Sequence, residues 1–433
     1  MARVGVSTME EICDVLVIGG GPAGSTIAAL LARRGKSVVL VDKDRHPRFH
    51  IGESLLPFNM PLFDQLGVRE EVERVGMPKF GIEFVSPNHP RPSLLEFGDG
   101  WQKGMDYSFQ VRRSDFDHIL LKNAIAKGAR VVEGCRMAEL DFVAGGGATA
   151  RGAMEDGGIR QWRARFVVDA TGRDTFLANR LKLKRRNRRH ESAAIYGHFT
   201  DAERLPGKAE GNISIFWFAK GWIWFIPLSD GTTSVGAVCP PAVIKERQGD
   251  VTAFFRQLID TCPALAARLK GATLTGPATA TGNYSYGTDR MSGDGYILIG
   301  DASTFIDPVF STGVYLAMRS AFIGADAVVT CLDRPAQAKA ALKNFEREVV
   351  SGRDRFNWFI YRITSPTIRN LFMAPGSPFR IKAAVLSLLA GDVATGSPIR
   401  SRILMFKGIY YAQAVANGIG RLLSRSSATA SGA

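Results

Sequence analysis

Paired cysteines are missing from this chain of 433 residues. Its five cysteines are odd in number and scattered, and none forms a CxxC pair; they are Cys13, Cys135, Cys239, Cys262 and Cys331. The pattern argues against a disulfide framework and against a zinc site, so we expect no metal. It fits a reducing compartment, and we expect a cytoplasmic protein.

Long apolar runs and linkers are also missing. No stretch reaches the roughly 18 apolar residues of a membrane-spanning helix, and the short polar start, residues 1–11, does not resemble a secretory signal. With 45% hydrophobic residues, the chain can bury more than one ordinary core. Because no long Pro/Ser/Gly segment divides it, we expect two lobes that share an interface.

Acidic residues are few, with 41 Asp and Glu against 55 Lys and Arg, which gives a net charge of +14. The excess is concentrated in 182–189, with six cations in eight residues, and in 353–425, where 11 Lys and Arg oppose two Asp. No nucleic-acid-binding motif accompanies the charge, so we expect no nucleic-acid partner. The plain interpretation is a solvated surface, and the sharper alternative is a docking face for an acidic protein.

The most informative segment that is present lies near the start of the chain. Residues 13–18 (CDVLVI) form an apolar run of strand length, and a glycine-rich turn, 19–24, follows. The Ala- and Leu-rich stretch 25–35 ends on two arginines and a glycine, as a helix should. A second apolar strand, 37–41, ends at Asp42, so the unit is strand, glycine turn, helix and strand.

Each part of this unit has a physical role in holding a dinucleotide. In the pattern Gly19-x-Gly21-x-x-Gly24, the first glycine permits the tight turn and the second lets the backbone approach a pyrophosphate. Gly24 lets helix and strand pack closely, and the helix N-terminus attracts the phosphate charge. Asp42 can accept hydrogen bonds from ribose hydroxyls. The candidate cofactor residues here are therefore Gly19, Gly21, Pro22, Ala23, Gly24, Asp42 and Lys43.

Further elements are expected downstream. A helix should begin at Ser114, short strands are expected at 130–132, 166–169 and 296–299, a helix at about 313–332, and largely helical structure after 353. The segment 193–238 alternates β-branched and aromatic residues between Gly/Asp turns, which indicates an antiparallel sheet. The Ser/Ala/Gly-rich end, 424–433, is expected to be disordered.

Two later motifs indicate which dinucleotide cofactor the chain binds. Asp169-Ala170-Thr171-Gly172 and Gly300-Asp301 each end a short apolar strand. Together with the glycine fingerprint, over residues 12 to 330, they resemble the flavoprotein monooxygenase superfamily with the aromatic-hydroxylase fold. That resemblance implies bound FAD, with Asp301 on the ribityl chain and phosphates. It adds as cofactor-binding residues Glu53 and Ser54 in a flavin-lining Gly-Glu-Ser segment, Arg112, Asp169, Gly172, Gly300, Asp301 and Gly313.

Three segments resemble one branch of that superfamily, the flavin-dependent halogenases. Trp222-Ile223-Trp224-Phe225-Ile226-Pro227 matches their WxWxIP signature, and two tryptophans two apart in a strand face the same side. In the family these rings lie near the flavin. The alternative is a pair of ordinary core tryptophans.

The second segment is Pro78-Lys79-Phe80-Gly81, which resembles the halogenase segment whose lysine projects into a tunnel between flavin and substrate. The resemblance implies that a flavin hydroperoxide oxidises chloride or bromide to hypohalous acid. Lys79, as the catalytic residue, would then hold the acid or form a haloamine. The alternative is a surface lysine.

The third segment matches the family pattern FxxPxxSxG from Phe305 to Gly313. In relatives its later part lies beside the flavin and offers backbone N–H groups to the halide, which implies Ser311, Thr312 and Gly313 here. The alternative is a flavin turn shared with hydroxylases. Tryptophan halogenases carry a glutamate where this chain has Phe310, a departure that resembles the halogenases of phenols and pyrroles.

The motifs and the resemblance together predict a fold, a division into lobes and an activity. The fold is α/β, with an FAD-binding Rossmann-like (glutathione-reductase-type) lobe at 12–190 and 285–345 and an antiparallel β-sheet substrate lobe at 191–284. A helical C-terminal region, 346–424, and a disordered tail, 425–433, complete the chain. The predicted activity is FADH2- and O2-dependent halogenation of a phenol or pyrrole, with carrier-protein tethering as a hypothesis.

No second dinucleotide fingerprint provides an NADPH site, so a separate flavin reductase is expected. The alternatives are an FAD-dependent aromatic monooxygenase, a reductase of isoprenoid double bonds and a non-catalytic flavin-binding protein. The reductase alternative would use the apolar segment 381–389 as a membrane-surface contact.

Overall fold

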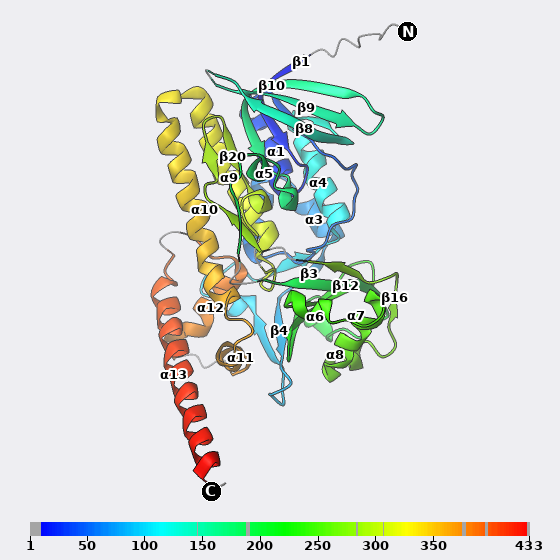
Figure 1. Ribbon diagram of the computed structural model, residues 1–433, viewed down its shortest axis with the longest axis vertical. Helices are drawn as coiled ribbons and strands as arrows, with labels where there is room; N and C mark the ends of the chain where they lie inside the picture. The colour runs from blue at the N-terminus through cyan, green and yellow to red at the C-terminus, as the bar shows by residue number, and fades with distance from the viewer. Residues whose placement is uncertain are drawn as a thin grey trace.

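The chain folds into two lobes with a helical edge along both, as the computed structural model in Figure 1 shows. The structure describes residues 10–144, 146–187, 191–282, 285–305, 307–374, 378–394 and 397–430. The predicted α/β class, with a Rossmann-type lobe, is confirmed. Arg188 and Arg189 of the basic run lie outside the described residues.

The first lobe is built on a sheet whose strand order is β19-β20-β10-β1-β2-β7. Strands β20, β10, β1, β2 and β7 pair in parallel, and the β8–β9 hairpin continues the sheet antiparallel from β10. Their bounds are β1 Glu10–Ile18, β2 Val38–Val41, β7 Arg130–Val132, β8 Cys135–Phe142, β9 Ala148–Met154, β10 Ile159–Asp169, β19 Ser292–Gly293 and β20 Tyr296–Leu298.

Three helices pack on this sheet and share one core with it. They are α1 Pro22–Arg33, α4 Arg113–Ala126 and α9 Thr312–Asp333. Within the described part of the chain, α9 alone is long and apolar enough to cross a membrane by length and composition, with a mean hydropathy of 1.3. It packs between α1 and α10, Ala338–Ile360, which is the ordinary environment of a core helix.

The second lobe contains a sheet of strand order β16-β12-β15-β14-β13-β4-β5, with β17 paired to β12. Its bounds are β4 Gly81–Val85, β5 Ser93–Glu96, β12 Ala193–Thr200, β13 Ile213–Phe218, β14 Gly221–Pro227, β15 Thr233–Cys239, β16 Thr273–Leu274 and β17 Thr279–Thr281. The sheet is antiparallel except where β4 joins β13 in parallel. Residues 81–96, which we expected in the first lobe, form part of the second.

The two faces of this sheet have different cover. Short helices pack on one face around Phe255; they are α6 Pro241–Lys245, α7 Val251–Asp260 and α8 Pro263–Arg268. The face that carries Trp217, Trp222 and Trp224 shares a core with the C-terminal helices. These helices are α10, α11 Pro366–Met373, α12 Ile381–Ala390 and α13 Arg400–Ala430.

A stack of aromatic rings joins the last helix to this sheet. Phe406 of α13 stacks on Phe372 of α11 at 6.4 Å, and Phe372 on Phe84 of β4 at 5.0 Å, between ring centroids. Phe84 in turn stacks on Trp217 of β13 at 5.2 Å. Trp217 is the register partner of Trp222, so the stack ends beside the first tryptophan of the WxWxIP segment.

The end of the chain differs from the expectation. Helix α13 continues to Ala430, so the predicted disorder from residue 424 is not seen up to 430, and 431–433 lie outside the described residues. Alanine and arginine in this stretch are good helix formers, and the helix simply propagates through the serines.

Candidate functional site

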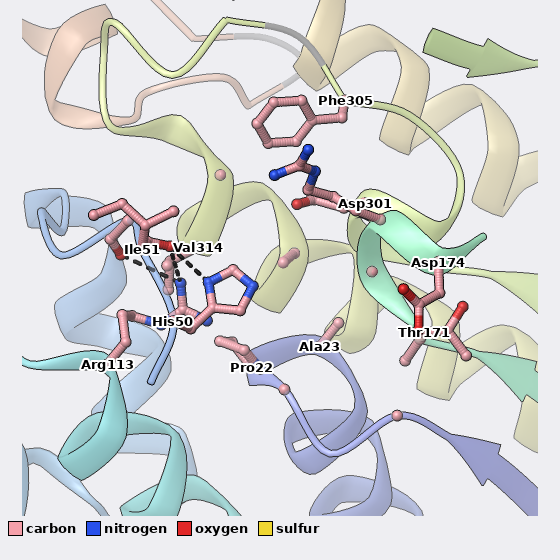
Figure 2. A pocket seen from close by; sticks show the side chains of 18 of the residues that line it. Pro22, Ala23, His50, Ile51, Arg113, Thr171, Asp174, Asp301, Phe305 and Val314 are labelled. Atoms are coloured by element: carbon pink, nitrogen blue, oxygen red, sulfur yellow. Dashed lines mark hydrogen bonds between the residues drawn. The ribbon is translucent and has the colours of Figure 1, made fainter. Parts of the chain in front are cut away.

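One cavity of about 600 Å³ joins the two lobes. The glycine turn before α1 lines it at one end, and Trp222, Trp224 and Ile226 of β14 line it at the other. Figure 2 looks into it: Pro22 and Ala23 lie below, His50 and Arg113 on one side, and Asp174 and Asp301 on the other.

The glycine turn leaves no room for side chains where the backbone must pass closely. Gly19 has φ +105°, and a Cβ there would lie 2.3 Å from the carbonyl oxygen of Ala170. A Cβ on Gly24 would lie 1.8 Å from the carbonyl oxygen of Gly19. Helix α1 starts on Gly21 with no side-chain cap from the described residues, so its first N–H groups remain open to a ligand.

Asp42 closes the adenosine end of the cavity. Its carboxylate accepts hydrogen bonds from the backbone N–H of Gly20 and, at 2.8 Å, from that of Asp44. Lys43 also lines the cavity and pairs with Asp174 at 2.5 Å. Together with the open helix end, this carboxylate suits the ribose and pyrophosphate of a dinucleotide. The residues present therefore fit FAD.

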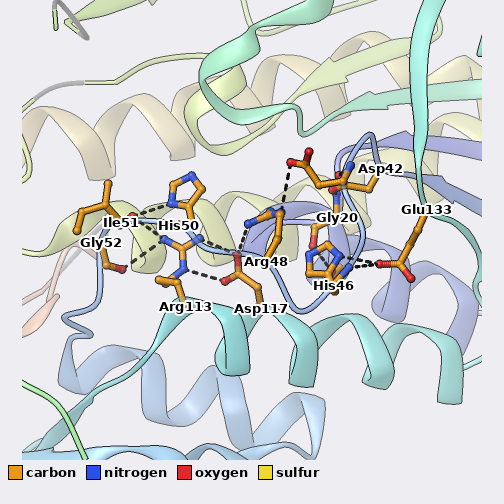
Figure 3. A network of polar contacts seen from close by, with 12 residues as sticks. Gly20, Asp42, His46, Arg48, His50, Ile51, Gly52, Arg113, Asp117 and Glu133 are labelled. Atoms are coloured by element: carbon orange, nitrogen blue, oxygen red, sulfur yellow. Dashed lines mark hydrogen bonds and ion pairs between the residues drawn. The ribbon is translucent and has the colours of Figure 1, made fainter. Parts of the chain in front are cut away.

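A buried polar network holds the segment 48–52, which lines the cavity beside α4, as Figure 3 shows. Arg113 pairs with Asp117 at 2.8 Å and donates to the carbonyl oxygens of Ile51 and Gly52. Burial acts against ionisation of Asp117, but Arg113 keeps its pKa below the usual value. The neighbouring Arg113 charge and burial lower the pKa of His50 to about 4, so this imidazole is neutral.

The structure does not place Arg112 in the cavity lining. Its side chain points to the second lobe, where it pairs with Asp230 and donates to Thr232 Oγ1 at 2.7 Å. Arg113, the next residue, lines the cavity instead and was missed by the sequence reasoning. The signal that could have found it is the i,i+4 spacing of Arg113 and Asp117 on one face of α4.

The two later aspartates have different positions. Asp169 is fully buried outside the lining, where it accepts hydrogen bonds from Thr171 and from the N–H of Leu177. It therefore shapes the turn that brings Gly172 to the cavity. Asp301 lines the cavity, and burial raises its pKa to about 6 against the opposing effect of Arg113 and Arg173. Gly300, with φ +56°, packs closely on Ala23.

The tryptophans lie together at the far end. Trp222 and Trp224 both line the cavity, with ring centroids 6.0 Å apart. Trp224 Nε1 donates to Ser234 Oγ at 3.1 Å, and its ring fills the space above Gly236. Pro227 ends β14 outside the lining.

Lys79 is buried, and the alternative of a surface lysine is wrong. Its side chain is 0% exposed. Its Nζ donates to Ser54 Oγ at 2.9 Å and to the carbonyl oxygen of Leu55 at 3.1 Å. Ser54 lines the cavity, so the ammonium lies directly behind that wall. Burial lowers the pKa of Lys79 to about 7, which leaves both protonation states populated near neutral pH.

The FxxPxxSxG segment forms the wall beside α9. Phe305, Pro308, Ser311 and Gly313 line the cavity, while Thr312 is buried at the first position of the helix outside the lining. Phe310 packs edge-on against Phe359 and Phe372 in the apolar core. The position where tryptophan halogenases carry a glutamate is therefore a core position in this chain.

A cavity with a dinucleotide turn at one end and a sheet from a second lobe at the other defines a flavoprotein oxidoreductase. The family model for an FAD binding domain matches residues 12–345. A 1H-pyrrole-2-carbonyl-(peptidyl-carrier protein) chlorinase of Pseudomonas fluorescens is 31% identical over 406 residues, covering 88% of this chain and 90% of that protein.

Solved structures share this fold. A flavoprotein/dehydrogenase from Cytophaga hutchinsonii superposes with a TM-score of 0.86 at 30% identity, covering 94% of this chain and all of that one. The myxobacterial chondrochloren halogenase gives 0.77 at 32%, covering 90% and 92%. The chain belongs to the FAD-binding family and, within it, to the flavin-dependent halogenases; it is an oxidoreductase whose cofactor is FAD.

Proposed function

We propose that this enzyme halogenates an electron-rich aromatic ring, a phenol or a pyrrole, through hypohalous acid that Lys79 directs to the ring. One observation carries the proposal: a fully buried lysine lies behind the wall of a cavity that runs from the dinucleotide turn to two tryptophans. A buried amine with few competing partners is suited to hold a small reactive oxidant.

Each wall of the cavity has a part in this chemistry. Reduced FAD, when bound, reacts with O2 and halide to supply hypohalous acid, and a separate flavin reductase supplies the reduced cofactor. Backbone N–H groups at the start of α9, beside Ser311 and Gly313, hold the halide. The Lys79–Ser54 pair holds the hypohalous acid, and the rings of Trp222 and Trp224 keep water from the substrate end.

A turnover assay tests this function. The enzyme is supplied with FAD, a flavin reductase, NADH and chloride or bromide, and is offered hydroxybenzoyl and pyrrole-2-carbonyl thioesters on a carrier protein beside the free acids. We expect a product with a halogen isotope pattern in mass spectra, and none without halide. A halide-independent gain of one oxygen would assign the enzyme to the hydroxylases instead.

We further propose that the substrate arrives on an acidic carrier protein and that a basic patch of the C-terminal region receives it. The patch consists of Arg380 and Arg402, whose guanidinium groups lie 4.4 and 4.8 Å from the ring centroid of Trp101, and of Lys382, which pairs with Asp99 at 3.7 Å. Phe379 beside it is 75% exposed. Basic groups with an apolar neighbour fit an acidic helical partner.

Charge reversal tests this docking surface. The double variant Arg380→Glu/Arg402→Glu is expected to raise KM for the carrier thioester roughly tenfold at low salt with kcat unchanged, because charges on the rim of an interface act on association. Added salt should narrow the difference. Arg160→Glu, at the exposed start of β10, is the control with the same change of sign and should leave KM unchanged. Equal KM values for the wild type, the double variant and the control would show that the patch takes no part in carrier docking.

A further inference from the structure

One buried carboxylate in the cavity has a hydrogen-bond partner on only one of its two oxygens, among the described residues. Glu53 is 1% exposed and lines the cavity. Its Oε1 lies 2.7 Å from Nε2 of His198, and because a carboxylate only accepts, that nitrogen carries the proton. Oε2 is buried and has no hydrogen-bond partner in the described part of the chain. A buried polar atom without a partner is costly, which indicates that a ligand in the cavity completes it.

The carboxylate is held rigidly. The carbonyl oxygen of Glu53 accepts from the N–H of Val111 at 2.8 Å, and the N–H of Leu55 donates to the carbonyl of Phe109 at 3.0 Å. His198 lies within β12, which pairs along its length with β15. Both members of the pair therefore belong to fixed backbone, as a group that must meet a reacting atom requires.

The pair lies at the aromatic end of the cavity. Tyr196 is two residues before His198 on β12, so the two side chains share a face of the strand. The Tyr196 ring lines the cavity and lies 6.3 Å from the ring of Trp224. Glu53 thus faces the cavity from the side of the sheet that carries the tryptophans.

Other acidic residues of the lining are engaged near the dinucleotide turn. Asp42 accepts from two backbone N–H groups, Asp44 pairs with Arg48 at 3.8 Å, and Asp174 pairs with Lys43. Asp301 belongs to the turn that packs on Ala23 at the start of α1. Glu53 is the carboxylate that the substrate end of the cavity offers.

We propose that Glu53 is a catalytic residue that removes the proton from the ring during halogenation, and that His198 is its positioning residue. The inference rests on the proposed function. A new carbon–halogen bond forms as the oxygen–halogen bond of hypohalous acid breaks, and the oxygen leaves as hydroxide that becomes water. The ring C–H bond then breaks, its electron pair restores aromaticity, and the proton goes to Oε2 of Glu53, which then releases it to the hydroxide to form the water. The sum is ring C–H plus hypohalous acid giving ring C–halogen plus water.

The first test is Glu53→Gln, which keeps shape and loses basicity. The resemblance implied a cofactor-binding role for Glu53, but its carboxylate is bound to His198 of β12 in the second lobe. We therefore expect FAD binding, followed by flavin fluorescence, and halide-dependent trapping of hypohalous acid by a free 1,3-diketone to be retained. The kcat for a carrier-bound pyrrole-2-carbonyl thioester should fall by about 100-fold or more, the usual contribution of a general base. A ring-deuterated substrate should show a primary isotope effect in the variant that is absent in the wild type, because proton removal has become slow. Formate should partly restore Glu53→Ala.

Matched variants separate this role from a structural one. His198→Gln keeps an N–H donor for Glu53 and should stay near wild-type kcat, whereas His198→Ala should lower it. Glu83→Gln changes another buried glutamate, bound to Arg268 at 2.9 Å outside the cavity, and should create no isotope effect. Loss of FAD binding or of trapped hypohalous acid in Glu53→Gln, or the absence of an isotope effect, would overturn the proposal. A wild-type enzyme that forms no oxidised halide would instead refute the proposed function.

Discussion

Replacing Lys79 with methionine is expected to lower kcat for ring halogenation by about 1,000-fold or more while leaving FAD binding intact. The lysine is fully buried behind Ser54, outside the cavity lining, so the cofactor keeps its contacts. Methionine is close in volume and removes only the amine. A positioned acid–base group contributes about 10²–10⁴-fold, and loss of substrate orientation adds to this. The measurement is single-turnover halogenation beside flavin fluorescence.

The same variant has a second signature in stability. Burial lowers the pKa of Lys79 to about 7, whereas the unfolded chain keeps the ordinary value near 10.5. Between these two pH values the unfolded state binds more protons, so the free energy of unfolding rises with pH across that window. Below about pH 7 the full cost of a buried ammonium is present. Lys79→Met should therefore stabilise the apoprotein at pH 6, by about 2 kcal/mol, and should remove this pH dependence.

Denaturant unfolding at pH 6 and pH 9 checks the linkage. Lys184→Met, at a half-buried lysine at the start of β11 (Lys184–Arg186) beside Tyr286, is the control and should keep both halogenation and the rise of stability with pH. A Lys79→Met enzyme that still halogenates at the wild-type rate would show that Lys79 takes no part in the reaction.

Replacing Gly24 with alanine is expected to abolish FAD binding and to destabilise the first lobe. The added Cβ would lie 1.8 Å from the carbonyl oxygen of Gly19, a backbone atom that cannot turn away as a side chain can. Helix α1 must then move off β1, and its N-terminus no longer points at the pyrophosphate. Overpacking costs about 1–3 kcal/mol where side chains can adjust, so we expect at least the upper value here.

Thermal unfolding with and without FAD measures this effect. The wild type should gain stability from the cofactor, and Gly24→Ala should not. The matched control is Gly408→Ala in α13, where an added Cβ meets nothing within 4 Å. That change should leave FAD binding unaltered and raise stability slightly, since alanine favours a helix over glycine by about 0.5–1 kcal/mol. Equal FAD affinity in both variants would contradict the close packing of the turn.

Local patterns predicted the parts of the fold that depend on neighbouring residues. The strand, glycine turn and helix from residue 13 to 33 could be predicted because a dinucleotide turn requires glycine at fixed spacing. The position of β4 in the sheet could not be predicted. Its parallel pairing with β13 joins segments that are far apart in the sequence, and neither segment carries a pattern that indicates the other. The choice between Arg112 and Arg113 failed because adjacent positions at the start of a helix point about 100° apart, and the packing of α4 decides which of the two faces the cavity.

The candidate site shows the same division. The motifs predicted which segments meet, and Lys79, Trp222 and Asp301 do lie at or directly behind the walls of one cavity. The pairing of Glu53 with His198 could not be predicted, because it joins a loop of the first lobe to a strand of the second across 145 residues. Such contacts are set by how the lobes pack, which composition and periodicity do not describe.

The ring stack from Phe406 to Trp217 has a consequence for altering substrate range. Phe406 lies on the last helix and does not line the cavity, yet its neighbours lead through Phe372 and Phe84 to the strand beside Trp222. A larger or smaller side chain at Phe406 would tilt that series of rings and so change the shape of the aromatic end without touching a residue that meets the substrate. We therefore expect substitutions at Phe406 in α13 to change the substrate selectivity of this enzyme, although Phe406 does not line the cavity.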